Sequence, residues 1–317
     1  MFTLVFAVIA AIILFERTIF NRKYKSIRNK HVVVTGGSSG IGKCVAKLAV
    51  RYGAHVTIIG RDCKKLDTAV EEIQKGCYMV GQKVQGVSLD VCDYELVKAE
   101  FSNLEEKVGP IYMLVNCAGL AICGKLENVS NEDIKTLLNT NFLGTVYPTK
   151  MVITKMKERK EGIVVITASQ AALVGIYGLS IYSASKFALR GFAEALDMEM
   201  YPYNVSVTVA LPPDTDTPGF EMENKTKPTE TTLICGSGGI YKPEAVAQNL
   251  IEDALRGSFF STVGCESYFT ALLCVGMTRC TSLGELIAQV VLMGPLRVVG
   301  CIFLEYFYAI IRKCLYD

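Results

Sequence analysis

The chain has 317 residues and a formal net charge of +2, and hydrophobic side chains make up 50% of it. This length is enough for one large domain with a full core and additional segments, and the balanced charge without a dense Lys/Arg stripe excludes a protein built for nucleic-acid binding. The 12 cysteines contain no Cys-x-x-Cys pair, and both histidines, His31 and His55, lie in apolar runs. The sequence therefore predicts no metal site and no His-based catalysis.

The first element is an apolar segment, residues 1–25, which we predict to be an uncleaved membrane anchor. Phe2–Phe15 would span about 21 Å as a helix, short of a bilayer core of about 30 Å, so the segment crosses only if Glu16 and Arg17 lie near one interface. A cleaved signal peptide is the alternative, but the segment lacks a basic start and a small-residue cleavage site. The basic residues that follow it place the rest of the chain in the cytosol by the positive-inside rule: Arg22, Lys23, Lys25, Arg28 and Lys30.

Strand and helix patterns then alternate. Near-continuous apolar runs predict six buried strands, at His31–Thr35, Ala54–Ile59, Val84–Leu89, Ile111–Val115, Ile163–Ala168 and Val205–Ala210. Helices are predicted between them, notably over Lys43–Tyr52, Asn131–Lys157 and Ser180–Met200. Strands this apolar need helices on both faces of their sheet, so residues 30–265 are predicted to form a doubly wound α/β domain of the Rossmann type with a mostly parallel sheet.

A segment without a steady period, residues 212–240, interrupts this alternation. It is rich in Pro, Thr, Gly and charged residues, and a long irregular segment inside a compact domain is often a substrate lid. We predict a lid here. A helix resumes afterwards, with Pro243 in its first turn.

The C-terminal segment, residues 266–317, is apolar again and is predicted to associate with a membrane. Its two strongest runs, Leu286–Met293 and Val298–Ile311, are separated by Gly294 and Pro295. We expect either a helical hairpin that enters one leaflet or buried helices of the domain.

A glycine-rich turn directly follows the first predicted strand and opens a helix. Glycine allows the backbone to approach a phosphate, and the N-terminus of a helix offers free N–H groups and a positive dipole. At a strand-to-helix joint this pattern predicts a dinucleotide site, although a tight turn without a ligand is the alternative. The residues predicted to bind the cofactor here are Gly36, Ser38, Ser39, Gly40, Ile41 and Gly42.

The end of the second strand predicts which dinucleotide binds. An acidic residue there would hold the free ribose hydroxyls of NAD, but this chain has Arg61, with Lys65 one turn later. Arg61 can stack on adenine and pair with a 2′-phosphate, so the sequence favours NADP(H) over NAD(H). Asp62 points the other way, but we expect it to cap the next helix.

Later strand ends extend this cofactor site. Asp90, at the end of the third strand, is suited to the adenine edge. Asn116, Ala118 and Gly119 follow the fourth strand and are predicted to form a wall beside the cofactor.

The spacing of Tyr182 and Lys186 places both side chains on one face of a predicted helix. An ammonium beside a phenol favours the phenolate and lowers its pKa, and such a tyrosine can exchange a proton with a substrate oxygen. This spacing alone is also typical of a solvated helix face.

Together these motifs resemble the short-chain dehydrogenase/reductase family, over Lys30 to Gly257. The turn T-G-G-S-S-G-I-G is similar to that family's TGxxxGxG, and N-C-A-G to its NNAG, with Cys117 in place of Asn. Ser169 stands thirteen residues before Tyr182, as in the family's Ser, Tyr and Lys arrangement, and Asn141 matches the fourth member of its tetrad.

The resemblance implies a seven-stranded sheet and hydride transfer from NADPH to a ketone. Tyr182 would protonate the ketone oxygen and Ser169 would donate a hydrogen bond to it. Lys186 would lower the pKa of the tyrosine and hold the nicotinamide ribose. Asn141 would position a water that links Lys186 to solvent.

One departure from the family lies after the sixth strand, where Pro212-Pro213-Asp214 stands in place of a common Pro-Gly. The backbone beside the nicotinamide is therefore expected to differ in shape. Pro212, Thr215 and Thr217 still match the positions that contact the cofactor in the family.

The segments 35–44, 156–159, 182–187 and 212–220, with both apolar ends, further resemble family members that reduce a long-chain sphingoid ketone on the cytosolic face of the endoplasmic reticulum. This resemblance implies that substrate, contact with membrane lipid, and a possible homo-oligomer through the helices that carry Asn141 and Tyr182. Two alternatives stay open. One is another membrane-bound NADP-dependent carbonyl reductase or alcohol dehydrogenase, acting on a steroid, a retinoid or a long-chain lipid, and the other is a non-catalytic NADP-binding interaction protein.

Overall fold

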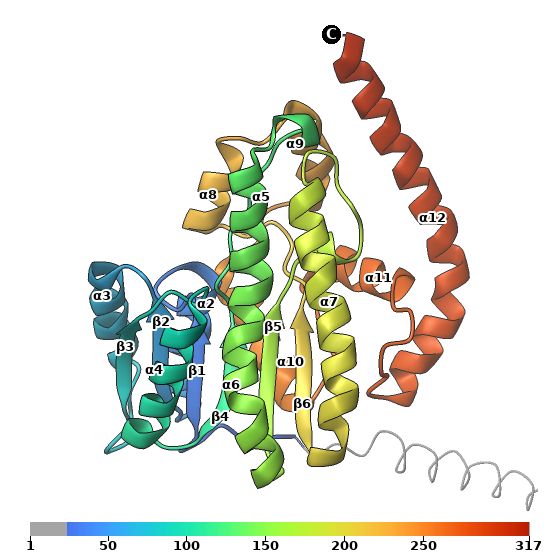
Figure 1. Ribbon diagram of the computed structural model, residues 1–317. Helices are drawn as coiled ribbons and strands as arrows, with labels where there is room; N and C mark the ends of the chain where they lie inside the picture. Colours follow the sequence, from blue (N-terminus) through green and yellow to red (C-terminus); the bar gives the residue numbers. More distant parts are fainter. Residues whose placement is uncertain (1–23, 317) are drawn as a thin grey trace, which may run out of the picture.

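A seven-stranded parallel sheet with the order β3-β2-β1-β4-β5-β6-β7 forms the centre of the protein (Figure 1). It is seen in a computed structural model that describes residues 24–316. All six predicted strands are present, and Phe260–Ser261 adds the seventh. The strands are β1 His31–Thr35, β2 His55–Gly60, β3 Val84–Ser88, β4 Ile111–Asn116, β5 Gly162–Thr167, β6 Val205–Ala210 and β7 Phe260–Ser261. The strand order reverses between β1 and β4, which is where ligands bind in folds of this type.

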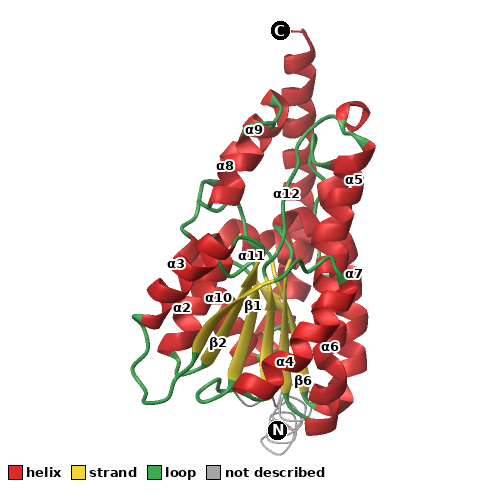
Figure 2. Ribbon diagram, turned by 60° about the vertical axis from the view of Figure 1, so that its left-hand side comes forward, coloured by secondary structure: helices red, strands yellow, loops and turns green. Residues whose placement is uncertain are grey.

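Helices cover both faces of the sheet, as the apolar strands require (Figure 2). On β1, Val32 and Val34 join the core on one face, whereas Val33 joins the core on the other. The first face is covered by α2 (Gly40–Arg51), α3 (Cys63–Gln74) and α10 (Pro243–Arg256). The second is covered by α4 (Tyr94–Val108), α6 (Gly144–Arg159) and α7 (Ser180–Met200). The predicted Rossmann-type fold is confirmed.

The single helix predicted over Asn131–Lys157 is instead divided. It consists of α5 (Asn131–Leu138), a π-helical turn η2 (Asn139–Leu143) and then α6. Within this turn Asn141 is fully buried and bonds to groups outside its own helix. A wide turn of this kind is frequent at functional sites, and a hydrophobic period does not reveal it.

The predicted lid is more regular than its sequence indicates. It contains α8 (Pro218–Asn224) and α9 (Thr229–Cys235), and Thr217 caps α8 by accepting a hydrogen bond from the Phe220 N–H at 3.2 Å. Helices of seven residues are too short to show a sustained period, so they were not expected. The part of the chain that the structure describes also contains four 3₁₀ turns: η1 Leu126–Asn128, η3 Gln170–Ala172, η4 Tyr201–Tyr203 and η5 Gly236–Gly238.

The C-terminal segment is neither a hairpin nor a set of buried helices. After α11 (Gly264–Leu273), one 34-residue helix, α12 (Leu283–Tyr316), continues through Gly294 and Pro295 and projects beyond the body of the protein (Figure 1). An apolar helix can tolerate such residues when neighbouring groups satisfy the freed backbone. The helix over residues 283–315 is long and apolar enough to cross a membrane, and only 6% of an 18-residue apolar stretch of it is buried inside the protein. The predicted N-terminal anchor falls almost wholly outside the described residues.

Candidate active site

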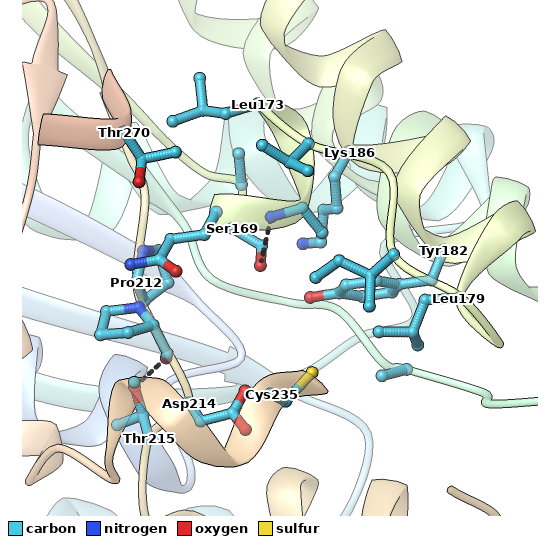
Figure 3. Close-up of a pocket in the computed structure, with 18 of the residues that line it drawn as sticks. Ser169, Leu173, Leu179, Tyr182, Lys186, Pro212, Asp214, Thr215, Cys235 and Thr270 are labelled. Atoms are coloured by element: carbon cyan, nitrogen blue, oxygen red, sulfur yellow. Dashed lines mark hydrogen bonds between the residues drawn. The ribbon is translucent and has the colours of Figure 1, made fainter. Parts of the chain in front are cut away.

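A cavity of about 800 Å³ lies at the carboxyl ends of the central strands. Its walls come from the turn after β1, the ends of β4, β5 and β6, the start of α7, the lid, α11 and α12. In Figure 3 the side chains of Ser169, Tyr182 and Lys186 extend toward a common space within it. The predicted site residues that line this cavity are Gly36, Ser38, Ser39, Gly40, Ile41, Gly42, Ala118, Gly119, Ser169, Tyr182, Lys186, Pro212, Thr215 and Thr217.

The glycine-rich turn is a cradle that side chains would fill. Gly36 has a φ of +64°, and a Cβ there would lie 2.8 Å from the backbone of Cys117 and Ala118. A Cβ at Gly42 would lie 2.4 Å from the Gly36 carbonyl oxygen. The first turn of α2 carries no acidic residue, and its N-cap, Ser39, makes no side-chain capping bond. The N-terminus of this helix therefore fits a phosphate group.

Three predicted cofactor residues, Arg61, Lys65 and Asp90, do not line the cavity. Arg61 directly follows β2 and is exposed. A Cβ at Gly60, the last residue of that strand, would lie 3.2 Å from Ser38 Oγ, so the turn and the start of the Arg61 segment are adjacent. Asp62 caps α3 as predicted, accepting from the Lys65 N–H at 3.1 Å. Asp90 accepts from the Cys92 N–H at 2.9 Å.

Asn116, predicted in the cofactor wall, directs its side chain into the core, and its part in the wall stays a prediction. Its side chain is 1% exposed and donates hydrogen bonds to Thr149 Oγ1 at 3.1 Å and to the Val165 carbonyl oxygen at 3.3 Å. Side chains alternate in direction along a strand, so the last residue of β4 turns toward α6 while the next residue, Cys117, faces the cavity.

Lys186 is buried and Tyr182 is half-buried at the start of α7. Lys186 Nζ donates to the Thr167 carbonyl oxygen at 3.1 Å, and burial lowers the pKa of this amine to about 8. Burial raises the pKa of Tyr182, and the hydrogen bond with Ser169 opposes that rise only in part. Desolvation of the phenolate thus outweighs the stabilising groups around it in the free protein, and the predicted lowering of this pKa by Lys186 stays a prediction.

Asn141 connects the fourth strand end to α7. Its Oδ1 accepts from the Leu120 N–H at 2.9 Å, and its Nδ2 donates to the Leu120 carbonyl oxygen and to Ser185 Oγ, each at 3.0 Å. One amide proton thus fixes the chain beside Gly119, and the other is donated to α7. A Cβ at Gly119 would lie 3.3 Å from Asn141 Oδ1 and 3.7 Å from Lys186 Nζ. The predicted link through water to Lys186 stays a prediction.

A charged cluster in the lid was missed from the sequence. Lys227 Nζ lies 2.9 Å from Glu223 Oε1 and 3.6 Å from Asp214 Oδ2, and it stacks 4.6 Å from the centre of the Phe220 ring. The side chain of Lys227 is only 3% exposed, and both acidic residues line the cavity. The i,i+4 spacing of Glu223 and Lys227 was a usable signal, but no helix was expected in this segment.

No metal-binding cluster of three or more His, Cys, Asp or Glu side chains occurs within residues 24–316. His31 lies in the core, bonded to the Gly109 carbonyl oxygen at 2.9 Å and to Thr57 Oγ1 at 2.8 Å. Burial lowers the pKa of His31 to about 4, so this ring is neutral at physiological pH.

Comparisons with known proteins agree with this geometry. Residues 30–228 match the family model described as short chain dehydrogenase. The chain is 48% identical over 290 residues to a 3-dehydrosphinganine reductase of Danio rerio, covering 91% of this chain and 87% of that protein. It is 48% identical over 286 residues to a 3-ketodihydrosphingosine reductase of Bos taurus, covering 90% and 86% respectively. Among solved structures, the apo form of LigO from Sphingobium sp. strain SYK-6 superposes with a TM-score of 0.64 at 27% identity, covering 76% of this chain and 84% of that one.

Proposed function

The chain belongs to the short-chain dehydrogenase family, and we propose that it uses NADPH to reduce 3-ketosphinganine to sphinganine in the synthesis of sphingolipids. One observation carries this proposal: Ser169, Tyr182 and Lys186 meet in one cavity beside a phosphate cradle. The relatives at 48% identity supply the substrate class, because both are named as reductases of this sphingoid ketone.

Residues of this chain supply the proton for the ketone oxygen and stabilise the negative charge that develops on that oxygen. NADPH, when bound in the cradle, supplies the hydride. The raised pKa of Tyr182 keeps the phenol protonated at neutral pH, which suits a group that must give a proton to a ketone oxygen. Ser169 donates a hydrogen bond to the same oxygen, where negative charge develops. Lys186, which donates a hydrogen bond to the Thr167 carbonyl oxygen, would hold the ribose of the nicotinamide.

The preference for NADPH over NADH rests on the end of β2. Arg61 is exposed there and next to the strand end that adjoins Ser38. The Arg61 guanidinium and the Ser38 hydroxyl can both bind a 2′-phosphate. The position directly after β2 carries no acidic residue that would hold the free ribose hydroxyls of NADH. Lys65 and Asp90 would complete the adenosine end of the site.

Assay of the purified full chain tests the function. With NADPH and 3-ketosphinganine we expect stoichiometric NADPH oxidation and sphinganine identified by mass spectrometry. Retinal and a ketosteroid serve as comparison substrates for the alternative of a different membrane-bound carbonyl reductase. Good turnover of either one without turnover of 3-ketosphinganine would reject the proposed substrate, and inactivity on all three would favour a non-catalytic NADP-binding protein.

We also propose that the protein divides into an anchor (1–25), a catalytic domain (30–265) with its lid (212–240), and a membrane-associated segment (266–317). The apolar helix α12 supports membrane association. The proposal further places the protein on the endoplasmic reticulum, with the catalytic domain in the cytosol and in contact with membrane lipid. It also includes a homo-oligomer that forms through α5, α6 and α7. Protease protection in microsomes and size-exclusion chromatography test them.

A further inference from the structure

The C-terminal helix forms one wall of the catalytic cavity. Its lining side chains are Leu296, Val299, Phe303, Leu304 and Phe307, with the backbone of Gly300 among them. These positions recur every three or four residues, so they share one face of α12. Phe307 comes eleven residues after Leu296, and at the rise of an α-helix this spacing corresponds to an apolar strip about 16 Å long.

The opposite face of α12 does not reach the cavity. Val298 and Ile302 lie on it and are 62% and 64% exposed. A helix that is apolar on every side but buried in so small a part is typical of one surrounded by lipid. One helix therefore presents one face to the reaction cavity and the other to its surroundings.

The wall is held in place by specific contacts. A Cβ at Gly300 would lie 2.9 Å from Leu273 Cδ2, so α12 and α11 approach closely at that point. In the connection before α12, Arg279 bonds to both carboxylate oxygens of Asp197 on α7, at 2.9 and 3.3 Å. The same α7 carries Tyr182, so the apolar strip and the proton donor are fixed to one framework.

One cavity extends from the catalytic residues to the lining face of α12. Leu173, which follows the turn after Ser169, and Leu273 of α11 line it together with the α12 residues. Figure 3 shows Leu173 and Thr270 among the side chains around this cavity. No Asp, Glu, Lys or Arg side chain other than Arg297 comes from α12 to the described cavity wall.

We propose that this strip of α12, with Leu173 and Leu273, binds the alkyl chain of the substrate and sets the preference for long chains. This inference rests on the proposed function and deepens it. Each methylene buried along an apolar strip contributes about fourfold in affinity, so a chain that lies along about 16 Å of α12 gains far more than a short ketone. The exposed opposite face of α12 would lie in the lipid from which this alkyl chain comes.

A matched pair of neighbouring residues tests this. Val299 lines the cavity, whereas Val298 faces away from it, so Val299→Asp and Val298→Asp make the same chemical change on different faces. Each full-length variant, solubilised in detergent, is assayed with 3-ketosphinganine and with a short-chain homologue that carries the same head group. We expect Val299→Asp to lower kcat/KM for the long substrate at least tenfold and to leave the short one within about twofold, while Val298→Asp changes neither.

Val299→Phe is the second variant, because it adds bulk without introducing a charge into the cavity wall, where Val299 is 44% exposed. It should shift the preferred chain length downward across a homologous series. Equal losses from Val298→Asp and Val299→Asp, or an unchanged chain-length profile in Val299→Phe, would overturn the inference. A wild-type protein that reduces neither sphingoid ketone would instead reject the proposed function, so the two failures are distinguishable.

Discussion

Lys186 Nζ lies 5.5 Å from the centre of the Tyr182 ring, over its face, and donates its hydrogen bond to the Thr167 carbonyl oxygen rather than to the phenol. The proposed role of the amine is therefore to act on the phenol through its field and to hold the ribose of a bound cofactor. In the free protein desolvation dominates both groups, raising the pKa of the phenol and lowering that of the amine. This combination favours a protonated tyrosine, which is the form that reduction of a ketone consumes.

Replacement of Tyr182 by Phe should remove the proton donor and keep the cavity. We expect kcat for ketone reduction to fall by roughly 10²–10⁴-fold, the usual contribution of a positioned acid, while the Kd for NADPH stays within about twofold. Steady-state kinetics and fluorescence titration measure the two quantities. Tyr78→Phe, at a position 60% exposed, is the control. Retention of most activity in Tyr182→Phe would remove Tyr182 from the mechanism.

The pH dependence of cofactor capture should report Lys186. Its amine loses its proton as pH rises through about 8 in the free protein, so kcat/KM for NADPH should be highest below that pH and fall above it. The Lys186→Met variant should be weakly active, and its kcat/KM for NADPH should not fall above that pH. A wild-type profile that stays flat to pH 9.5 would show that Lys186 remains charged or plays no part in cofactor binding.

Arg61→Ala should weaken the preference for NADPH without affecting NADH. A charge-assisted hydrogen bond is worth about 1.5–3 kcal/mol, so kcat/KM for NADPH should fall roughly 10–150-fold. Lys64→Ala, an exposed neighbour on the first turn of α3, is the matched control. If the NADPH to NADH ratio does not change in Arg61→Ala, the 2′-phosphate is bound elsewhere.

Lys227→Met should loosen the lid. The substitution leaves Asp214 and Glu223 facing each other without their cation, which should cost about 1–3 kcal/mol locally after allowance for the partial exposure of both carboxylates. Proteolysis within residues 212–240, followed by mass spectrometry, should be at least about fivefold faster than in the wild type. Lys225→Met, an exposed position in the same segment, should cleave at the wild-type rate. Equal rates for the two variants would mean that the cluster does not hold the lid.

Features encoded in contiguous residues were predictable. The turn from Gly36 to Gly42 needs glycine at positions where the structure shows a Cβ would collide with the backbone, and that need is visible in the chain itself. Strands such as β1 and β4 are continuous apolar runs because both faces of the sheet are covered there, whereas β3, at the edge of the sheet, has no buried residue. The i,i+4 spacing of Tyr182 and Lys186 placed both on α7.

Other features depend on how distant segments meet. Desolvation of Tyr182 arises from the walls around it, so the direction of its pKa shift could not be derived from the neighbouring lysine. Asn116 and Cys117 are adjacent in sequence, yet only the pairing of β4 within the sheet decides which of them faces the core. The sequence from Leu283 onward is apolar on every side of its helix, so its period cannot distinguish the face that lines the cavity from the face that does not. The tertiary packing of α12, including Gly300 against Leu273 and the Arg279–Asp197 pair before the helix, turns Val299 toward the catalytic cavity and Val298 away from it.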